Sequence, residues 1–326
     1  MTKGDSKKEK VEGKLVRCTV SQILDKATRY LRRRGIPEPR IDAEVLLAHV
    51  LKIERLQIYL NLDCQLTKKE LSAYEKLVER RVGREPVAFI VGHKEFMGLK
   101  FFLNKDVLIP RPETEILVEK VIEKVRNIGK PRSYGYRKDN SLVIVDLCTG
   151  SGNIAISLAK NIVSCKIYAT DISKGAIKIA RKNAKFHNVE EKVEFLLGDL
   201  FSPLEKLNSS LAVDFVVSNP PYVKSRDLVL LQPEIKKEPL CALVGGNEGL
   251  NFYRRIVPEA LKYLVDHGYL IMEIGDRQGK AVMNLIRKAK RFSPPQLVKD
   301  YAGLDRVVVA QKLKENGVSS IFDSLK

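Results

Sequence analysis

The stretch LVIVDLCTGSG, residues 142–152, decides the fold. Its first four residues are apolar and predict a buried strand, and the glycines Gly150 and Gly152 allow the chain to turn sharply and to approach a ligand closely. An apolar helix is expected to begin near Ile154. Since many nucleotide-binding proteins share a glycine-rich turn between a strand and a helix, the meaning of the turn depends on the strands that follow.

Short apolar runs continue the pattern through the rest of the chain, and helix-like segments separate them. Buried strands that alternate with helices are typical of a parallel sheet in an α/β domain. The predicted strands are Leu142–Val145, Lys166–Ala169, Val193–Leu196, Phe215–Val217, Tyr269–Met272 and Val307–Val309. The sequence therefore predicts a Rossmann-like α/β sheet with helices between its strands.

Acidic residues follow the first three of these strands. Asp146 precedes the glycines, Asp171 ends the second strand and Asp199 follows the third. The carboxyl ends of parallel strands meet at one edge of an open α/β sheet, where such sheets bind ligands. Three acids there suit a cationic nucleoside such as S-adenosylmethionine better than the pyrophosphate of NAD, which requires donors and positive charge. The alternative is that Asp171 and Asp199 cap the helices that follow them.

The fourth strand closes with Asn219-Pro220-Pro221-Tyr222. Consecutive prolines cannot continue a strand ladder, and each restricts the residue before it to extended backbone. The Asn219 side chain and the Pro220 carbonyl are therefore expected to point off the sheet edge as two acceptors for an entering NH2 group. This would hold the nitrogen in line with a methyl sulfonium, while Tyr222 stacks on the planar group. An ordinary Asn-Pro turn is the alternative, but the position after a glycine loop and two acids favours a nitrogen methyltransferase.

The N-terminal part has helical periodicity, and Thr67 with Glu70 forms a capping-box pattern at the start of one helix. Apolar residues between glycines then predict a pair of strands, after which Arg111-Pro112-Glu113-Thr114 starts another helix. The expected parts are a disordered basic tail (1–14), a small helical domain of three or four helices (15–90), a β-hairpin connector (91–112), the catalytic domain (113–315) with a basic loop at 126–139, and a C-terminal tail (316–326).

The formal net charge of +18 is the unusual feature of the composition. A basic surface attracts polyanions, so direct binding to nucleic acid is conceivable, but lysine and arginine are spread along the whole chain and a solubility effect is favoured. No apolar run reaches the roughly 18 residues of a membrane helix, and no secretory signal is present, so a cytoplasmic protein is expected. Five cysteines without a CxxC pair and four scattered histidines support neither a disulfide framework nor a metal site.

From about residue 20 to residue 311 the chain resembles the bacterial release-factor glutamine methyltransferases. The motifs that carry the resemblance are Asp42–His49 (DAEVLLAH), Gly92–Leu99 (GHKEFMGL), Leu108–Glu115 (LIPRPETE), the glycine loop, Asn219–Tyr222 (NPPY), Gly245–Leu250 (GGNEGL) and Glu273–Gly275 (EIG). The Arg-Pro-Glu-Thr segment together with the helical domain is much more specific than Asn-Pro-Pro-Tyr, which many nitrogen methyltransferases share.

The resemblance implies methyl transfer from S-adenosylmethionine to the N5 amide nitrogen of the glutamine in the Gly-Gly-Gln motif of peptide chain release factors, which act in translation termination. The helical domain would help to hold this protein substrate. Asn219, Pro220, Pro221 and Tyr222 would hold the glutamine amide, with Arg111 and Glu113 as secondary site residues. The implied cofactor contacts are Cys148, Thr149, Gly150, Ser151, Gly152, Asp171, Asp199, Leu200 and Asn219.

Cys148 stands where members of this family often carry glycine. If that position requires a positive φ, a cysteine there costs about 1 kcal/mol or more. Only a local adjustment is expected.

Other functions also fit parts of the sequence. A glutamine methyltransferase acting on a ribosomal protein would use the same chemistry at the same site. An adenine-N6 DNA methyltransferase also presents an NH2 group to such a site, but it must flip its base and usually carries a target-recognition region, which is not evident here. A cofactor-free module that binds the ribosome or RNA is suggested by the charge, but Asp171, Asp199 and Asn219 argue against it.

Overall fold

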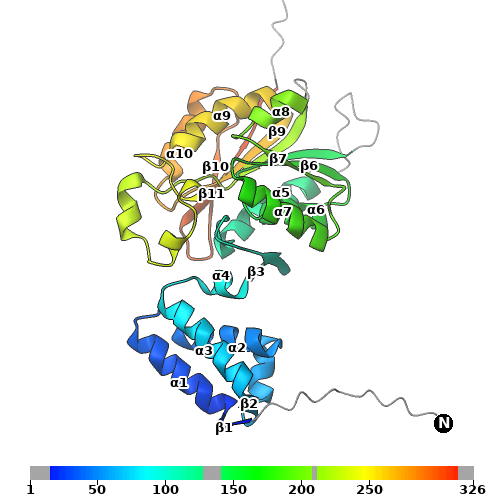
Figure 1. Ribbon diagram of the computed structural model, residues 1–326. Coiled ribbons are helices and arrows are strands. Elements are labelled where there is room, and N and C mark those ends of the chain that lie inside the picture. Colours follow the sequence, from blue (N-terminus) through cyan, green and yellow to red (C-terminus); the bar gives the residue numbers. More distant parts are fainter. Residues whose placement is uncertain (1–14, 128–140, 208–210, 315–326) are drawn as a thin grey trace, which may run out of the picture. The chain divides into compact units, whose positions relative to one another are not determined.

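The chain divides into two compact units, Met1–Gly92 and His93–Lys326 (Figure 1). The computed structural model describes residues 15–127, 141–207 and 211–314. The predicted tails at 1–14 and 316–326, and all but the first two residues of the predicted basic loop 126–139, lie outside the described residues. None of the helices in the described parts combines the length and the apolar character that crossing a membrane requires.

The first unit consists mainly of short helices. Its elements are β1 (Leu15–Thr19), α1 (Val20–Arg33), α2 (Pro39–Leu51), the 3-10 helix η1 (Arg55–Leu60), β2 (Gln65–Thr67), α3 (Lys68–Val82) and α4 (Val87–Val91). The predicted capping box is present at α3, because Glu70 N donates to Thr67 Oγ1 at 3.2 Å and Thr67 N donates to Glu70 Oε2 at 2.7 Å. The antiparallel pair of β1 and β2 was not predicted, since such short strands carry too little alternation to be recognised.

The acids of the DAEVLLAH motif are used inside the first unit. Asp42 Oδ2 accepts a hydrogen bond from Arg81 Nε at 2.7 Å, and both side chains are buried. Glu44 Oε1 accepts from Arg40 Nε at 2.7 Å and from the Tyr59 hydroxyl at 2.5 Å. These bonds tie α2 to α3 and to η1, so the two acids hold the helices together.

The described part of the second unit is built on a seven-stranded sheet. The strands are β5 (Leu142–Leu147), β6 (Cys165–Asp171), β7 (Val193–Leu197), β8 (Val213–Ser218), β9 (Leu264–Glu273), β10 (Gln296–Lys299) and β11 (Asp305–Gln311), in the spatial order β10-β11-β9-β8-β5-β6-β7. The five neighbouring strands β9, β8, β5, β6 and β7 pair in parallel. Strand β11 pairs antiparallel with β9, and β10 pairs antiparallel with β11. The predicted α/β sheet is confirmed. Only β10 was not predicted, because it is a short edge strand with exposed polar ends.

Helices cover both faces of this sheet (Figure 1). The helices of the described part of this unit are η2 (Pro112–Thr114), α5 (Glu115–Asn127), α6 (Asn153–Asn161), α7 (Lys174–Phe186), α8 (Ser202–Leu207), η3 (Ser225–Leu230), η4 (Ile235–Lys237), η5 (Leu240–Ala242), α9 (Asn251–Tyr263) and α10 (Gly279–Lys288). Val143, Val145 and Leu147 of β5 share one buried cluster with residues of α8, α9 and α10. Because side chains alternate along a strand, the intervening residues of β5 face the layer formed by α5, α6 and α7.

The hairpin of β3 (His93–Phe96) and β4 (Leu99–Phe102) opens the second unit. Met97 and Gly98 both have positive φ, at 52° and 68°, which is the geometry of a tight two-residue hairpin turn. Asn183 on α7 accepts from Phe102 N at 2.8 Å and donates to the carbonyl of Ser151 at 2.9 Å. Through Asn183, helix α7 therefore forms hydrogen bonds both to the hairpin and to the glycine loop.

The order of the strands creates a switch point at β5. The chain proceeds from β5 to β6 and β7 on one side and then returns to place β8 on the other side. At its end, Leu147 is paired with Thr170 of β6 and with Ser218 of β8. The loops that leave β5 and β8 therefore begin side by side, at the place where open α/β sheets bind ligands.

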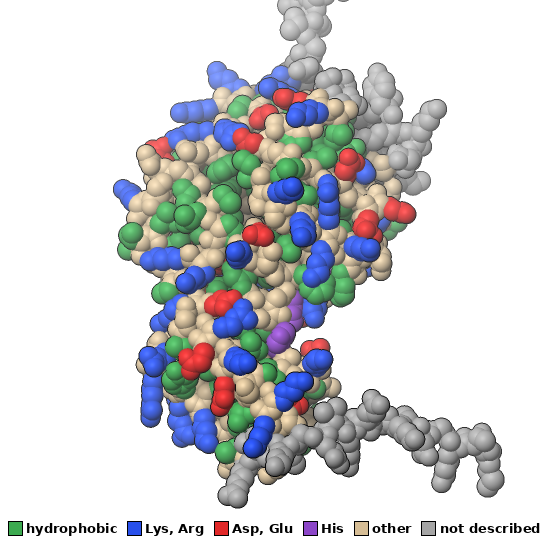
Figure 2. Space-filling model, viewed as in Figure 1, with side chains coloured by type: hydrophobic (Ala, Val, Ile, Leu, Met, Phe, Trp, Pro, Cys, Tyr) green, Lys and Arg blue, Asp and Glu red, His purple; other side chains and the backbone are tan. Residues whose placement is uncertain are grey.

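Lysine and arginine side chains are spread over the visible face of each unit, between acidic and apolar side chains (Figure 2). This face shows no single basic patch that gathers the net charge of +18. The distribution matches the spacing of these residues along the sequence.

Candidate active site

The glycine loop after β5 is held in left-handed backbone. Cys148, Gly150 and Gly152 have φ values of 60°, 54° and 80°. A Cβ on Gly152 would lie 3.0 Å from Ile156 and 3.3 Å from Phe195, so packing also requires glycine there. A Cβ on Gly150 would meet nothing within 4 Å, which leaves room for a ligand to approach. The positive φ at Cys148 means that the position does favour glycine, at a cost of about 1–2 kcal/mol for cysteine.

Asp171 joins this loop to the turn before α7. Gly150 N donates to its Oδ2 and Ser173 N donates to its Oδ1, both at 2.8 Å. The helix cap itself is Ser173, whose Oγ accepts from Ala176 N at 3.2 Å, so Asp171 does not cap α7 through its side chain. Burial raises the pKa of the Asp171 carboxyl, and the two backbone bonds act in the opposite direction.

Asp199 lies at the same edge but is paired. Its Oδ2 is 2.6 Å from the guanidinium of Arg255 on α9, and both side chains are nearly half exposed. The next residue, Leu200, has a φ of 49°. Burial raises the pKa of the Cys148 thiol. The negative charges of Asp171, Asp146 and Asp199 raise this pKa further. Arg255 was not predicted, because nothing in the sequence near it marks it as a partner of Asp199.

Asp146 does not line this edge as expected. It is 0% exposed, and its Oδ2 accepts a hydrogen bond from Thr149 Oγ1 at 2.6 Å. Burial raises its pKa to about 7 and the bond from Thr149 lowers it. The Asp146 side chain therefore holds the glycine loop through Thr149 and does not face a ligand, because β5 places Asp146 in the core before the chain turns.

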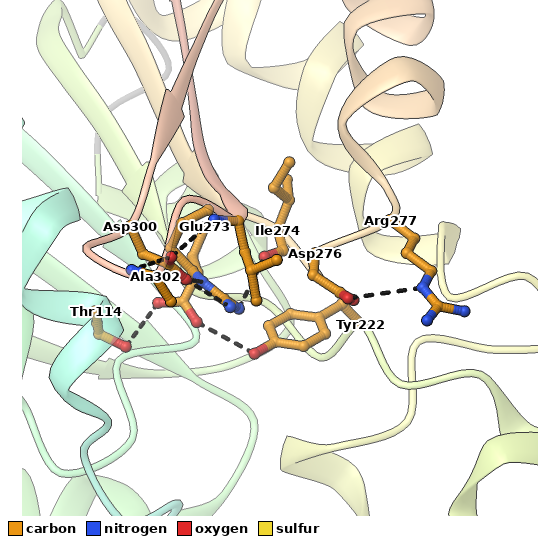
Figure 3. Close-up of polar contacts among 10 residues, drawn as sticks. Thr114, Tyr222, Glu273, Ile274, Asp276, Arg277, Asp300 and Ala302 are labelled. Atoms are coloured by element: carbon orange, nitrogen blue, oxygen red, sulfur yellow. Dashed lines mark hydrogen bonds and ion pairs between the residues drawn. The ribbon is translucent and has the colours of Figure 1, made fainter.

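The Asn219–Tyr222 segment is held by residues that are distant in sequence. Asn219 Nδ2 donates to Thr114 Oγ1 at 3.1 Å, and Thr114 Oγ1 donates to Glu273 Oε2 at 2.6 Å. The Tyr222 hydroxyl donates to Glu273 Oε1 at 3.2 Å. Figure 3 shows Thr114 and Tyr222 reaching Glu273 from two sides. Burial raises the pKa of Glu273 to about 7, while the bond from Thr114 and the charge of Arg306 lower it.

The GGNEGL motif packs against the backbone of this segment. A Cβ on Gly245 would lie 2.6 Å from the Pro221 carbonyl oxygen, and one on Gly249 would collide with the Tyr222 carbonyl. Gln278 Nε2 donates to the same Tyr222 oxygen at 3.0 Å. Close backbone approach therefore explains the glycines of the motif.

The two secondary candidates have different surroundings. Arg111 forms an ion pair with Glu238, whose side chain is 1% exposed and whose Oε2 also accepts from Ile109 N at 3.0 Å. Glu113 lies in η2, next to Thr114, and its charge raises the pKa of Glu273. Thr114 and Glu273 stand in two of the motifs quoted above, but no role was predicted for either, since neither motif indicates its partner in the other.

Comparison with known proteins gives matches to both units. Residues 22–92 match the family model of the PrmC N-terminal domain, and residues 136–237 match that of the methyltransferase small domain. The release factor glutamine methyltransferase of Thermodesulfovibrio yellowstonii is 42% identical over 275 residues, which cover 84% of this chain and 92% of that protein. The protein of the same name from Geobacter sulfurreducens is 38% identical over 291 residues, covering 89% and 95%.

A solved structure is similar in fold. The crystal structure of the hMettl16 catalytic domain matches with a TM-score of 0.51 at 15% sequence identity, over 74% of this chain and 83% of that one. At this identity the likeness concerns the fold alone.

Proposed function

The chain belongs to the family of release factor glutamine methyltransferases, as its motifs predict, and we propose that it carries out the reaction that gives the family its name. It transfers the methyl group of S-adenosylmethionine to the side-chain amide nitrogen, N5, of the glutamine in the Gly-Gly-Gln motif of peptide chain release factors. The observation that carries the proposal is that the glycine loop and the Asn219–Tyr222 segment leave neighbouring strands at the switch point of the sheet.

The glycine loop and Asp171 fit a cationic nucleoside. When bound, S-adenosylmethionine supplies a methyl group on a positively charged sulfur. The open space at Gly150 allows close approach, and each Asp171 oxygen keeps a lone pair for a ribose hydroxyl beyond its bond to a backbone N–H. Negative charge on Asp171 at this edge favours a cation over a phosphate, whereas the charge of Asp199 is paired with that of Arg255.

The Asn219–Tyr222 segment fits a planar NH2 group. Asn219 gives its own NH2 to Thr114, and no described residue donates a hydrogen bond to its Oδ1. Oδ1 and the Pro220 carbonyl can then each accept one hydrogen from the substrate amide. An amide nitrogen is a poor nucleophile, because its lone pair is delocalised into the carbonyl. Its reaction therefore depends on position and on acceptors that stabilise the positive charge developing on the NH2 group.

The first unit is suited to hold a protein substrate. Its η1 helix exposes large apolar side chains, with Leu56 75%, Tyr59 49% and Leu60 84% exposed. Apolar groups gathered on one short helix are typical of surfaces that a protein partner covers. We therefore assign this unit to recognition of the release factor and the second unit to the chemistry.

A methyl-transfer assay tests the proposal. The purified chain with labelled S-adenosylmethionine is offered release factor, ribosomal protein and DNA in parallel, and mass spectrometry of the digested product locates the methyl group. The expected result is a single methyl group on the glutamine of the Gly-Gly-Gln peptide. Methylation of a ribosomal-protein glutamine or of adenine in its place would overturn the assignment of the substrate.

A further inference from the structure

A series of hydrogen bonds joins Asn219 to the buried carboxylate of Glu273. Asn219 Nδ2 is 3.1 Å from Thr114 Oγ1, which is 2.6 Å from Glu273 Oε2. The Tyr222 hydroxyl reaches the other carboxylate oxygen at 3.2 Å (Figure 3). Both the first and the last residue of the Asn219–Tyr222 segment are thus tied to the same carboxylate.

The chemistry of the groups fixes the direction in which each bond donates. Above a pH of about 7, where the Glu273 side chain is ionised at its raised pKa, the carboxylate only accepts hydrogen bonds, so both hydroxyls donate to it. A threonine hydroxyl has a single proton, and Thr114 gives its proton to Glu273. Toward Asn219 the Thr114 oxygen can therefore only accept. The Asn219 amide must turn its NH2 group to Thr114, and its oxygen faces away from Thr114.

We propose that Thr114 and Glu273 are positioning residues, which hold the Asn219 amide so that its oxygen, rather than its nitrogen, meets the NH2 group of the substrate. This rests on the proposed function, because only an NH2 substrate requires an acceptor at that place. The two ends of an asparagine amide have nearly the same shape, so hydrogen bonds decide between them. With the amide reversed, two NH2 groups would face each other and neither could accept.

Burial of Thr114 and Glu273 stabilises this orientation of the Asn219 amide. Thr114 is 1% exposed and Glu273 is 0% exposed, so water does not replace a missing partner at either side chain. The two residues come from η2 and from the end of β9, and both elements are packed into the second unit. The position of the hydroxyl is therefore fixed by the fold before any substrate is bound.

A double-mutant cycle on the full chain tests the proposal. Thr114→Val removes the hydroxyl, Thr114→Ser keeps it, and Asn219→Ala removes the amide that it orients. At a pH above 7, where Glu273 is ionised, and with release factor and S-adenosylmethionine saturating, we expect Thr114→Val to lower the single-turnover rate by roughly 10- to 100-fold, because the Asn219 amide is then free to turn. Thr114→Ser should stay within a few-fold of the unmodified chain. In the Asn219→Ala background, Thr114→Val should cause no further loss, because its effect passes through that amide.

Two outcomes would overturn the proposal. One is an equal loss from Thr114→Val in both backgrounds, which indicates a structural role; the other is an unchanged rate in Thr114→Val. Thr28→Val is the matched control, since the buried Thr28 hydroxyl has no hydrogen-bond partner among the described residues and its loss should leave the rate unchanged. If Thr114→Val does not fold, a rate in Thr114→Ser as low as that of Asn219→Ala would overturn the proposal. An unmodified chain that methylates no glutamine refutes the proposed function instead.

Discussion

On each of the two sides of the site, a buried carboxyl group accepts a hydrogen bond from a threonine hydroxyl, but the two bonds span very different lengths of sequence. On the side of the glycine loop, the buried Asp146 accepts a hydrogen bond from a threonine hydroxyl at 2.6 Å, and the threonine is three residues away. On the side of the Asn219–Tyr222 segment, the buried Glu273 accepts from a threonine hydroxyl at 2.6 Å, and this threonine is 159 residues away. The first pair stiffens one loop, whereas the second joins η2 to the end of β9, the last of the parallel strands.

This difference separates two tasks. The glycine loop is shaped by its left-handed backbone and by the bond from Gly150 N to Asp171, whose other oxygen accepts from Ser173 N in the turn before α7. Backbone geometry of this kind shapes a place where a ligand is bound. The Asn219–Tyr222 segment is oriented by side chains, and these control which atom meets the substrate. We therefore assign cofactor affinity mainly to the first side and the rate of methyl transfer mainly to the second.

The largest expected effect is on the rate. Asn219→Ala removes one acceptor and frees the substrate amide to rotate away from the methyl group. By analogy with the loss of one oxyanion-hole donor, kcat should fall by about 10²–10³-fold. Single-turnover methylation with saturating cofactor measures this loss. Asn161→Ala, which removes an amide hydrogen bond at the end of α6, should keep the normal rate. A near-normal rate in Asn219→Ala would refute the proposed role of Asn219.

The next effect is on cofactor affinity. Asp171→Ala removes the carboxylate that binds the glycine loop and that is proposed to accept from the ribose. Loss of hydrogen bonds to a charged group corresponds to about 1.5–3 kcal/mol, so the Kd for S-adenosylmethionine should rise by roughly 10- to 100-fold. Calorimetric titration measures the Kd, with the exposed Asp25→Ala of the first unit as control. An unchanged Kd in Asp171→Ala would remove this residue from the cofactor site.

Both buried carboxylates should make stability depend on pH. Burial raises the pKa of Asp146 and of Glu273 to about 7, above their ordinary values of 3.8 and 4.5. The folded chain holds these protons where the unfolded chain releases them, so the free energy of unfolding falls as the pH rises from those ordinary values through about 7. Asp146→Asn and Glu273→Gln should each make this fall less steep, by on the order of 3–4 kcal/mol in total over that pH range. Urea unfolding at a series of pH values checks the slope, and slopes equal to that of the unmodified chain would contradict the shifted pKa values.

The smallest expected effect concerns Cys148. Cys148→Gly relieves left-handed backbone strain, but it also makes the unfolded chain more flexible. The free energy of unfolding should therefore rise by no more than about 1 kcal/mol. Thermal unfolding detects this change, and Lys290→Gly offers a comparison at another positive φ, 55°, outside the site. A lower Tm for Cys148→Gly would mean that contacts of the thiol outweigh the strain.

The sequence predicted those features that lie within a few residues of one another. Buried apolar runs identified the central strands, and the capping box at Thr67 was recognised from two residues three positions apart. The bond from Thr114 to Glu273 could not be predicted, because it depends on how the end of β9 meets η2 in space. The pairing of Asp199 with Arg255 was missed for the same reason. Asp146 was placed at the sheet edge, because sequence spacing does not show how deeply a strand end is buried.

The separation of affinity from rate can be tested most directly by measuring both quantities in both variants. For Asp171→Ala and Asn219→Ala, the Kd for S-adenosylmethionine is measured by calorimetry and the single-turnover rate is measured at saturating cofactor and release factor. We predict that Asp171→Ala loses affinity but recovers most of its rate at saturation. Asn219→Ala should lose its rate while its Kd changes by no more than a few-fold. If each variant loses affinity and rate together to a similar extent, the two sides do not act separately and the account is wrong.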